Sequence, residues 1–510
     1  MSISSYRITL VSLAALSLSF AATAATARIS DPPAVDTAQG AATPHPFEDV
    51  RKVILKTLEE AKVPSIAVAV VQDGKIIWEE GFGWADKEQK IPATAHTAYS
   101  LASMTKPITA TAVMKLREAG KLDIDAPIER YLGGVKLAGR AGSTKAVTAR
   151  RIMAHSAGLP QYGNFYLDGA EPAGSKETIA KFGIVVFPPN TRFEYSNIGM
   201  RILDAAIAQM SGLSYGAYLE REIFKPLGMT DSALGLPPGA RAAMRYDHDR
   251  HPMRFYRTDH PGSGDVWASA HDMARFLAFH MGAPLPDQAA ILRAATRLEM
   301  QRAASPMPMP TPPGAPRRDI AANWIVTTIN GHPQVWHSGG QPGVSTFMTM
   351  YPDQKLAFVI LANSSAPLGR VGQAIRAAIA PEVLEPTTEP STASPQPVPF
   401  HGKWIGTATS YAGEQPLVLT FETTGEIKVQ LDDQPRAALI KPAFENGALT
   451  ARFDGRSNIP EAARAEHGLS LKLILVKGEL VGQMVAQGMN DKTVFMLPSF
   501  VRLHAASETR

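Results

Sequence analysis

The chain has 510 residues, 45% of them hydrophobic and 19% charged, which is typical of a soluble protein long enough for more than one domain. Its formal net charge of +4 is small for this length. No basic helix interleaves with aromatic residues, so we do not expect a nucleic-acid partner. The chain has no cysteine, which excludes disulfides, thiolate metal sites and a cysteine nucleophile.

The first residues predict export. Arg7 precedes an apolar run over 8–22, and the tripeptides 22–24 and 25–27, both Ala-Thr-Ala, offer small residues for a cleavage site. We therefore expect residues 1–27 to be a secretory signal peptide, and the mature protein to be periplasmic or secreted. An uncleaved membrane anchor is the alternative. No later stretch reaches about 18 uninterrupted apolar residues, so no other membrane span is expected.

A helix and a β-hairpin are predicted next. Apolar residues recur at helical spacing over 47–61. Two apolar runs, 65–71 and 75–83, flank Asp73-Gly74. An Asp-Gly pair between such runs is a strong hairpin signal.

The segment 99–120 combines a serine and a lysine at the start of an apolar helix. Ser103 and Lys106 are three positions apart, so they would share one helix face. A hydroxyl needs a nearby base to become a nucleophile, and a lysine amine is a base only when burial or a neighbouring cation lowers its pKa. Taken alone, the pattern also fits an N-cap serine and a solvated lysine. Pro107 places the helix start close to Ser103, because proline is tolerated only in the first turn.

Two polar segments follow in the middle of the chain. Thr148 is suited to cap a short helix, and His155-Ser156 comes after it. Neighbours in sequence do not face each other on a helix, so we expect a structural role for Ser156. Tyr195 and Asn197 lie where a Pro-Pro-Asn turn enters an apolar helix, and polar groups there can point into a cleft.

No metal or other cofactor is predicted. Residues 247–251, Asp-His-Asp-Arg-His, have the composition of a metal site, but they lie in a loop-like stretch without a ligand-spaced partner such as His-Glu-x-x-His. Residues 262–276 predict a glycine-rich turn followed by a helix from Ser269. We interpret this segment as an insertion that forms a wall of the domain, and not as a phosphate-binding loop. Residues 306–316 are rich in Pro and Met and predict an exposed loop.

The last part of the chain predicts two sheets. Strand signals at 324–329, 346–351 and 357–363 come in close succession, with a Gly-rich connection at 335–343 between the first two and a helix over 372–380 after them. Several short β-like runs separated by turns then predict a small antiparallel barrel. The expected organisation is a mature N-terminus at 28–45, a hydrolase domain at 46–384, a Pro/Ser/Thr linker at 385–399 and a β-barrel-like domain at 400–510.

Three short motifs occur in order: Ser103-Met-Thr-Lys106, Tyr195-Ser-Asn197 and His337-Ser-Gly339. With their flanks SLASMTKPIT, TARRIMAHSAGLP, FEYSNIGMRIL and HSGGQPGVSTFMTMYP, they resemble the serine β-lactamase and penicillin-binding-protein superfamily over about residues 46–380. The closest branch is that of class C β-lactamases, DD-peptidases, D-aminopeptidases and family VIII esterases. The resemblance implies an α+β fold: an antiparallel sheet flanked by helices, with an all-α region.

The resemblance also implies roles for individual residues. Ser103 would attack a carbonyl and become acylated, and Lys106 would help to take its proton. Tyr195, as a tyrosinate beside Lys106, could act as the base in acylation and activate water in deacylation. Asn197 would orient Lys106 and hold the substrate. The family's oxyanion hole maps to the backbone N–H groups of Ser103 and Gly340.

His337, which with Gly339 forms the third motif, departs from the β-lactamase pattern. A lysine there usually serves the carboxylate of a β-lactam, whereas a neutral imidazole is a weaker anchor and its charge changes near pH 6.5. We therefore expect an acyl-enzyme hydrolase of esters or D-amino-acid peptides before β-lactams, with a small-molecule or peptide substrate. The alternative is a non-catalytic sensor of cell-wall peptides. Residues 400–510 could cover the cleft, mediate oligomerisation or bind a cell-wall polymer.

Overall fold

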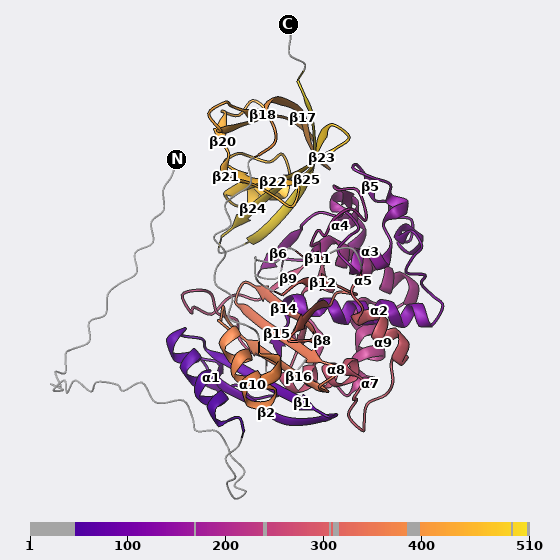
Figure 1. Ribbon diagram of the computed structural model, residues 1–510, viewed down its shortest axis with the longest axis vertical. Helices are drawn as coiled ribbons and strands as arrows, with labels where there is room; N and C mark the ends of the chain where they lie inside the picture. Colours follow the sequence, from indigo (N-terminus) through magenta and orange to yellow (C-terminus); the bar gives the residue numbers. More distant parts are fainter. Residues whose placement is uncertain are drawn as a thin grey trace, which may run out of the picture. The chain divides into compact units, whose positions relative to one another are not determined.

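The computed structural model of the chain (Figure 1) describes most of its residues. The predicted signal peptide, the segment 28–45, nearly all of the linker and most of the loop at 306–316 lie outside the described residues, so they stay predictions. Within the described part, no helix is both long and apolar enough to cross a bilayer. The described ranges are 46–167, 170–237, 242–304, 308–309, 316–384, 398–490 and 493–506.

A nine-stranded antiparallel sheet forms the centre of the first part of the chain (Figure 1). Its strands run in the order β11-β12-β13-β14-β15-β16-β1-β2-β3. The predicted hairpin is confirmed: β1 and β2 pair around Asp73 and Gly74, whose φ angles are 49° and 74°. The strands are β1 (Ser65–Gln72), β2 (Lys75–Asp86), β3 (Ile91–Pro92), β11 (Pro308–Met309), β12 (Arg318–Ile320), β13 (Ile325–Ile329), β14 (His332–Gln341), β15 (Val344–Tyr351) and β16 (Leu356–Ala362).

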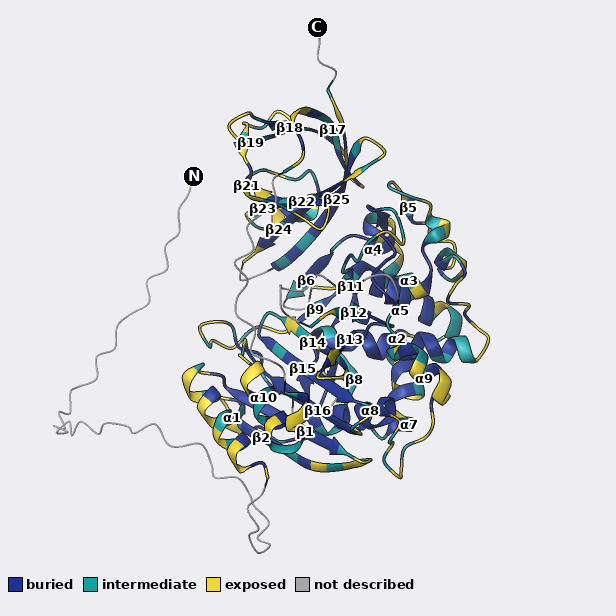
Figure 2. Ribbon diagram, viewed as in Figure 1, coloured by how far each residue is buried: buried dark blue, intermediate teal, exposed yellow. Residues whose placement is uncertain are grey.

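Side-chain alternation gives this sheet two buried faces. In β16, Phe358 and Ile360 join one hydrophobic cluster while Val359 and Leu361 join another, because successive strand residues point to opposite faces. Helices α1 (Glu48–Glu60) and α10 (Gly369–Ile379) pack against each other over the first face. Helices α2 (Thr105–Glu118) and α8 (Ala270–Met281) belong to the cluster on the second face. Figure 2 shows the central strands buried between these layers.

Several helices begin at a residue whose side chain caps them. Thr148 accepts a hydrogen bond from Arg151 N at the start of α3, and Ser196 accepts one from Gly199 N at the start of α5. Ser269 caps α8 in the same way. The remaining helices are α3 (Ala149–Met153), α4 (Ser175–Phe182), α5 (Asn197–Ser211), α6 (Tyr215–Leu219), α7 (Lys225–Leu227) and α9 (Ala294–Gln301).

One prediction in this region is wrong: the segment at 335–343 is not a connection but most of a strand, β14. Its glycines weaken the strand signal in the sequence. The structure gives a reason for one of them. A Cβ on Gly339 would lie 2.3 Å from Leu101 O and 2.3 Å from Thr346 Oγ1, so the backbone of Leu101 approaches the strand too closely for any side chain there.

The C-terminal part is an antiparallel, barrel-like sheet, as predicted, with strand order β20-β19-β18-β17-β25-β24-β23-β22-β21. Strand β25 also pairs with β6 (Gly163–Leu167), which pairs with β9 (Tyr256–Thr258), so the sheet continues onto the first part of the chain. The predicted fold class is therefore confirmed. The strands are β17 (Gly402–Ser410), β18 (Gly413–Phe421), β19 (Ile427–Leu431), β20 (Ala437–Ala438), β21 (Ile440–Glu445), β22 (Ala448–Phe453), β23 (His467–Val476), β24 (Glu479–Met489) and β25 (Thr493–Ala505).

The two glycines of β14 should respond differently to substitution. We expect Gly339→Ala to lower the free energy of unfolding by about 1–3 kcal/mol, because the added methyl group forces Leu101 and Thr346 apart. Gly340→Ala is the matched control, since a Cβ there meets nothing within 4 Å. Its effect should stay within about 0.5 kcal/mol. Urea unfolding of both variants measures the difference, and equal stabilities would contradict the close approach.

Candidate active site

The segment that carries Ser103 is fixed between two strands. Leu101 N donates to Val266 O of β10 (Val266–Ala268) at 2.9 Å, and Leu101 O accepts from Thr346 Oγ1 of β15 at 2.9 Å. Ala102 then adopts φ +48°, an uncommon value for a residue with a side chain, and turns the chain into α2. The helix begins at Thr105, after a single 3-10 turn, so it starts close to Ser103 as predicted.

Three of the predicted side chains meet at the serine hydroxyl. Ser103 Oγ lies 3.1 Å from Lys106 Nζ and accepts a hydrogen bond from the Tyr195 hydroxyl at 3.0 Å. Lys106 Nζ also lies 4.7 Å from the centre of the Tyr195 ring. Tyr195, which is 92 positions from Ser103 in the sequence, thus reaches the same oxygen atom as Lys106. This is the arrangement of a nucleophile with a base and a second proton carrier.

Lys106 is completely buried. Besides Ser103, its amine donates to Ser263 O at 3.0 Å, and no carboxylate within the described residues forms an ion pair with it. Burial without a counter-charge lowers the pKa of Lys106 well below its usual value. The amine is therefore available in its neutral form, which can accept the proton of Ser103.

Tyr195 is protonated at neutral pH, which corrects the tyrosinate expected from the sequence. Burial raises the pKa of its hydroxyl above the usual value of 10. The hydrogen bond to Ser103 opposes this shift but does not reverse it. In a buried pair, a neutral amine and a neutral phenol cost less than an ammonium and a phenolate. The base is thus assigned to Lys106, and Tyr195 is a donor in the resting state.

Asn197 lies in the first turn of α5, and only one of its two polar side-chain atoms is hydrogen-bonded within the described part of the chain. Its Nδ2 donates to Tyr162 O at 2.8 Å. Its Oδ1 is buried and has no hydrogen-bond partner within the described part of the chain. A buried amide oxygen without a partner costs free energy, so this atom is poised to accept a hydrogen bond from a ligand N–H.

His337 faces the same side of the sheet as Lys106. It pairs with Met348, a member of the cluster that contains α2, and its Nδ1 donates to Ser338 O at 2.6 Å. Burial, and next the nearby Lys106, lower its pKa to about 3. The expectation that its charge changes near pH 6.5 is therefore wrong, because a surface value does not apply to a buried imidazole.

Beyond His337, strand β14 is paired on one side only within the described sheet. Strand β13 pairs with β14 only as far as Trp336, whereas β15 pairs along the whole strand to Gln341. Gly339 and Gly340 therefore lie where the described sheet leaves one row of backbone groups unpaired. An extended ligand can add to such an edge. The oxyanion hole predicted at Ser103 N and Gly340 N stays a prediction.

Sequence reasoning missed His155. Its ring lies 4.5 Å from the Tyr195 ring, and its Nδ1 accepts from Ser196 N at 3.2 Å. Its Nε2 is buried without a hydrogen-bond partner among the described residues. Burial is the largest cause that lowers the pKa of His155, followed by Lys106 and His337. The hydroxyl of its neighbour Ser156 donates to Arg151 O at 3.5 Å, in keeping with a structural role.

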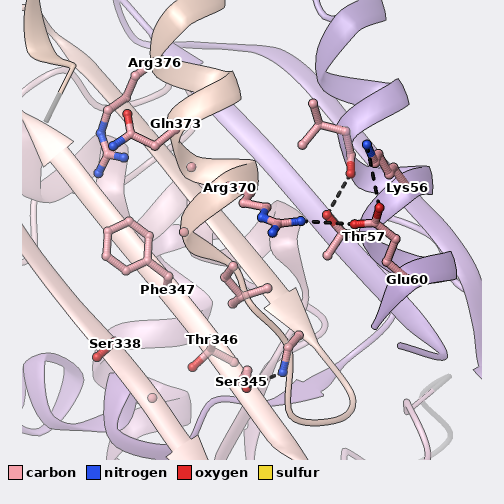
Figure 3. A pocket seen from close by; sticks show the side chains of 16 residues that line it. Lys56, Thr57, Glu60, Ser338, Ser345, Thr346, Phe347, Arg370, Gln373 and Arg376 are labelled. Carbon is pink, nitrogen blue, oxygen red and sulfur yellow. Dashed lines mark hydrogen bonds and ion pairs between the residues drawn. The ribbon is translucent and has the colours of Figure 1, made fainter. Parts of the chain in front are cut away.

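A hollow of about 840 Å³ adjoins the site on the opposite face of the sheet (Figure 3). Ser338 and Phe347 line it from β14 and β15, and helices α1 and α10 form its walls. Within it, Glu60 contacts both Lys56 and Arg370, so these charges are already paired. None of Ser103, Lys106 and Tyr195 is among its lining residues.

The barrel contacts the loop that carries Tyr195. The neighbouring residue, Glu194, is buried, and Lys472 Nζ and Gln483 Nε2 of the barrel donate to its two carboxylate oxygens at 2.5 and 3.0 Å. On the other side, Glu194 N donates to His155 O at 2.7 Å. We call Glu194, Lys472 and Gln483 the latch. The Glu194 carboxylate is held mainly by the barrel residues Lys472 and Gln483, because Arg192 Nε lies farther from it, at 3.7 Å.

Comparisons with known proteins identify relatives of this chain and solved structures of similar fold. Penicillin-binding protein 4* of Bacillus subtilis (strain 168) is 27% identical over 342 residues, which are 61% of this chain and 71% of that protein. The octameric penicillin-binding protein homologue from Pyrococcus abyssi superposes with a TM-score of 0.56 at 21% identity, over 88% of this chain and 99% of that chain. SurE with D-Leu superposes with a TM-score of 0.60 at 21% identity, over 89% and 99%.

The two structures cover most of the chain, so the likeness in fold extends into the barrel. Residues 50–381 match the family model described as β-lactamase. This match spans well over half of the sequence and contains all three motifs. The chain therefore belongs to the β-lactamase family of serine hydrolases.

Proposed function

We propose that this protein is an exported hydrolase that forms an acyl-enzyme on Ser103 from esters or from amides of D-amino acids. One observation carries the proposal: Lys106 and Tyr195 both lie within hydrogen-bond distance of Ser103 Oγ, and burial keeps the lysine amine neutral. A buried amine without a counter-charge is costly for a structural role alone. It is the form that a general base requires.

The residues suggest an order of proton transfers. Lys106 takes the proton of Ser103 as the oxygen attacks the substrate carbonyl. The resulting ammonium returns a proton, through the Tyr195 hydroxyl, to the departing alcohol or amine as the carbonyl bond to it breaks. Water then hydrolyses the acyl-enzyme by the same sequence. Lys106 takes a proton from the water as the water oxygen bonds to the acyl carbonyl. The ammonium returns that proton to Ser103 Oγ as the bond between this oxygen and the acyl group breaks. Backbone N–H groups of Ser103 and Gly340 would hold the oxyanion in both steps.

The polar groups around the serine favour an acyl group that carries an N–H. Asn197 Oδ1 is buried without a partner and can accept such a hydrogen bond. His337 is neutral over the physiological range, so it offers a carboxylate no positive charge. We therefore rank esters and D-amino-acid amides above β-lactams. The structural likeness to SurE with D-Leu supports the same choice.

The assembly state is part of the proposal. One solved structure of similar fold is an octameric penicillin-binding protein homologue, and its likeness to this chain includes the barrel. We propose that this protein also self-associates, with residues 400–510 contributing to the contact.

Covalent labelling tests the nucleophile. A fluorophosphonate probe should add one adduct to the full chain, and Ser103→Ala should abolish the adduct. Ser156→Ala is the matched control and should be labelled as fast as the wild type, because the Ser156 hydroxyl donates to a backbone carbonyl. Intact mass measures both. An unlabelled wild-type chain that also leaves p-nitrophenyl esters untouched would favour the non-catalytic sensor.

The pH dependence of acylation should report Lys106. Since its folded pKa is lowered, the reactive neutral amine is present at neutral pH, and the rate should fall as pH drops through that pKa. Lys106→Arg keeps a positive charge at every accessible pH, so we expect a loss of at least about 100-fold throughout the range. The rate of inactivation by the fluorophosphonate, measured from pH 5 to 9, gives the profile. His337→Asn should leave the position of the acid limb unchanged; a shifted limb would assign it to His337 instead.

The latch should affect turnover through Tyr195. Lys472→Met removes the main partner of a buried carboxylate beside Tyr195, and we expect kcat for a p-nitrophenyl ester to fall about tenfold with a smaller change in KM. Lys403→Met, at an exposed position of β17, is the matched control.

The double variant Glu194→Gln/Lys472→Met separates positioning from stability. It removes the unpaired charge while Gln483 can still donate to the side chain, so part of kcat should return. If kcat follows thermal stability in all three variants, or if Lys472→Met leaves kcat unchanged, the latch does not position Tyr195.

A further inference from the structure

The geometry points to a divalent transition-metal site, of the kind that takes Zn²⁺, formed by Glu79, His96 and His271. The three residues come from β2, from the turn before β4 (Tyr99–Ser100) and from the first turn of α8. Their ligand atoms all lie within 4.8 Å of one another. Two imidazoles and one carboxylate form the ligand set typical of a zinc ion that keeps a further position for water.

The individual contacts show how each ligand would be presented. His271 Nδ1 lies 2.7 Å from Glu79 Oε2, and His96 Nε2 lies 3.9 Å from Glu79 Oε1. The two imidazole rings are 4.5 Å apart at an angle of 33°. An ion bound between these atoms at about 2.0–2.1 Å would replace the proton now shared by His271 and Glu79.

An outer carboxylate supports the first histidine. Asp231 Oδ2 lies 2.9 Å from His96 Nδ1 and accepts a hydrogen bond from Ser269 Oγ at 3.1 Å. Because a carboxylate oxygen accepts, Nδ1 is the donor in this contact, and Nε2 is the ring nitrogen nearer Glu79, 3.9 Å from its Oε1. Metal-binding histidines almost always have such a partner on the second nitrogen, and it raises their basicity. A surface ion pair formed by chance has no need of it.

The backbone holds the ligands in place before any ion binds. His271 N donates to Ala95 O at 3.1 Å, which ties the start of α8 to the turn that carries His96. In that turn, Thr94 Oγ1 accepts from His96 N at 3.2 Å, and Thr97 Oγ1 accepts from Thr94 N at 2.9 Å. A site that is organised in this way loses little conformational entropy when it takes up an ion.

The exposure of the ligands fits an exchangeable ion. The side chain of His96 is 56% exposed, whereas those of Glu79 and His271 are 29% and 22% exposed. One side of the site is therefore open to solvent, and the other lies against the strand and helix that it joins. The cluster shares no residue with the Ser103 site. We infer that the ion clamps β2, the turn and α8 together and takes no part in acyl transfer.

Metal binding to the full chain tests this site. After chelator treatment and dialysis, Co²⁺ titration should give one equivalent of the visible absorption of a four- or five-coordinate ion, and Zn²⁺ should displace it. His96→Ala and His271→Ala should each weaken binding at least about 100-fold. Asp231→Asn should weaken it about 10- to 100-fold, the usual cost of removing an outer partner. Zn²⁺ should raise the Tm of the wild type but of neither histidine variant.

The double variant His248→Ala/His251→Ala is the matched control. It removes two histidines from the loop whose composition resembles a metal site, and Co²⁺ binding should not change. Fluorophosphonate labelling of Ser103 confirms that each variant is folded, and its rate should be the same with and without Zn²⁺. The site is overturned if Co²⁺ gives no saturable absorption, if the His96 and His271 variants bind as tightly as the wild type, or if binding is lost in the double variant.

Discussion

The structure depends on one unfavourable arrangement, a lysine amine buried without a carboxylate. Lys106 lies in the first turn of α2, and its partners are a hydroxyl, a backbone carbonyl and the face of an aromatic ring. Such surroundings do not repay the loss of hydration of an ammonium, so the neutral amine is favoured. The same burial keeps Tyr195 protonated and His337 uncharged. The charge states of these three side chains therefore follow from their burial more than from ion pairs.

This packing is possible because two backbones come together without a side chain between them. Gly339 lets β14 reach the carbonyl of Leu101, and the left-handed conformation of Ala102 then turns Ser103 toward Lys106. On the second side, the loop before α5 brings Tyr195 to the same oxygen. Together these contributions determine the position of a hydroxyl to within a hydrogen-bond length.

Local signals in the sequence predicted much of this fold. The Asp73-Gly74 turn and the Thr148 cap each act within a few residues, so they can be recognised without the rest of the chain. Strand β14 could not, because the reason for Gly339 is a contact with Leu101, more than 200 positions away. The charge states of Tyr195 and His337 were missed for a related reason: burial depends on all the elements that pack around a group. The ligands Glu79, His96 and His271 likewise come together only in the folded chain, whereas the histidine-rich composition at 247–251 pointed elsewhere.

The pairing of β25 with β6 joins the barrel to the first part of the chain by hydrogen bonds as well as by the covalent connection. Thr493 to Met496 add a strand to Gly163–Tyr166, and the carbonyl of the preceding residue, Tyr162, accepts the hydrogen bond from Asn197. A main-chain ladder and the contacts of Glu194 would remain if the chain were cut within residues 385–397. The two parts could then be supplied as separate polypeptides that assemble into one enzyme, and the free barrel could compete with the attached one for the same edge. If two copies of the chain exchanged their barrels, each barrel would make these same contacts.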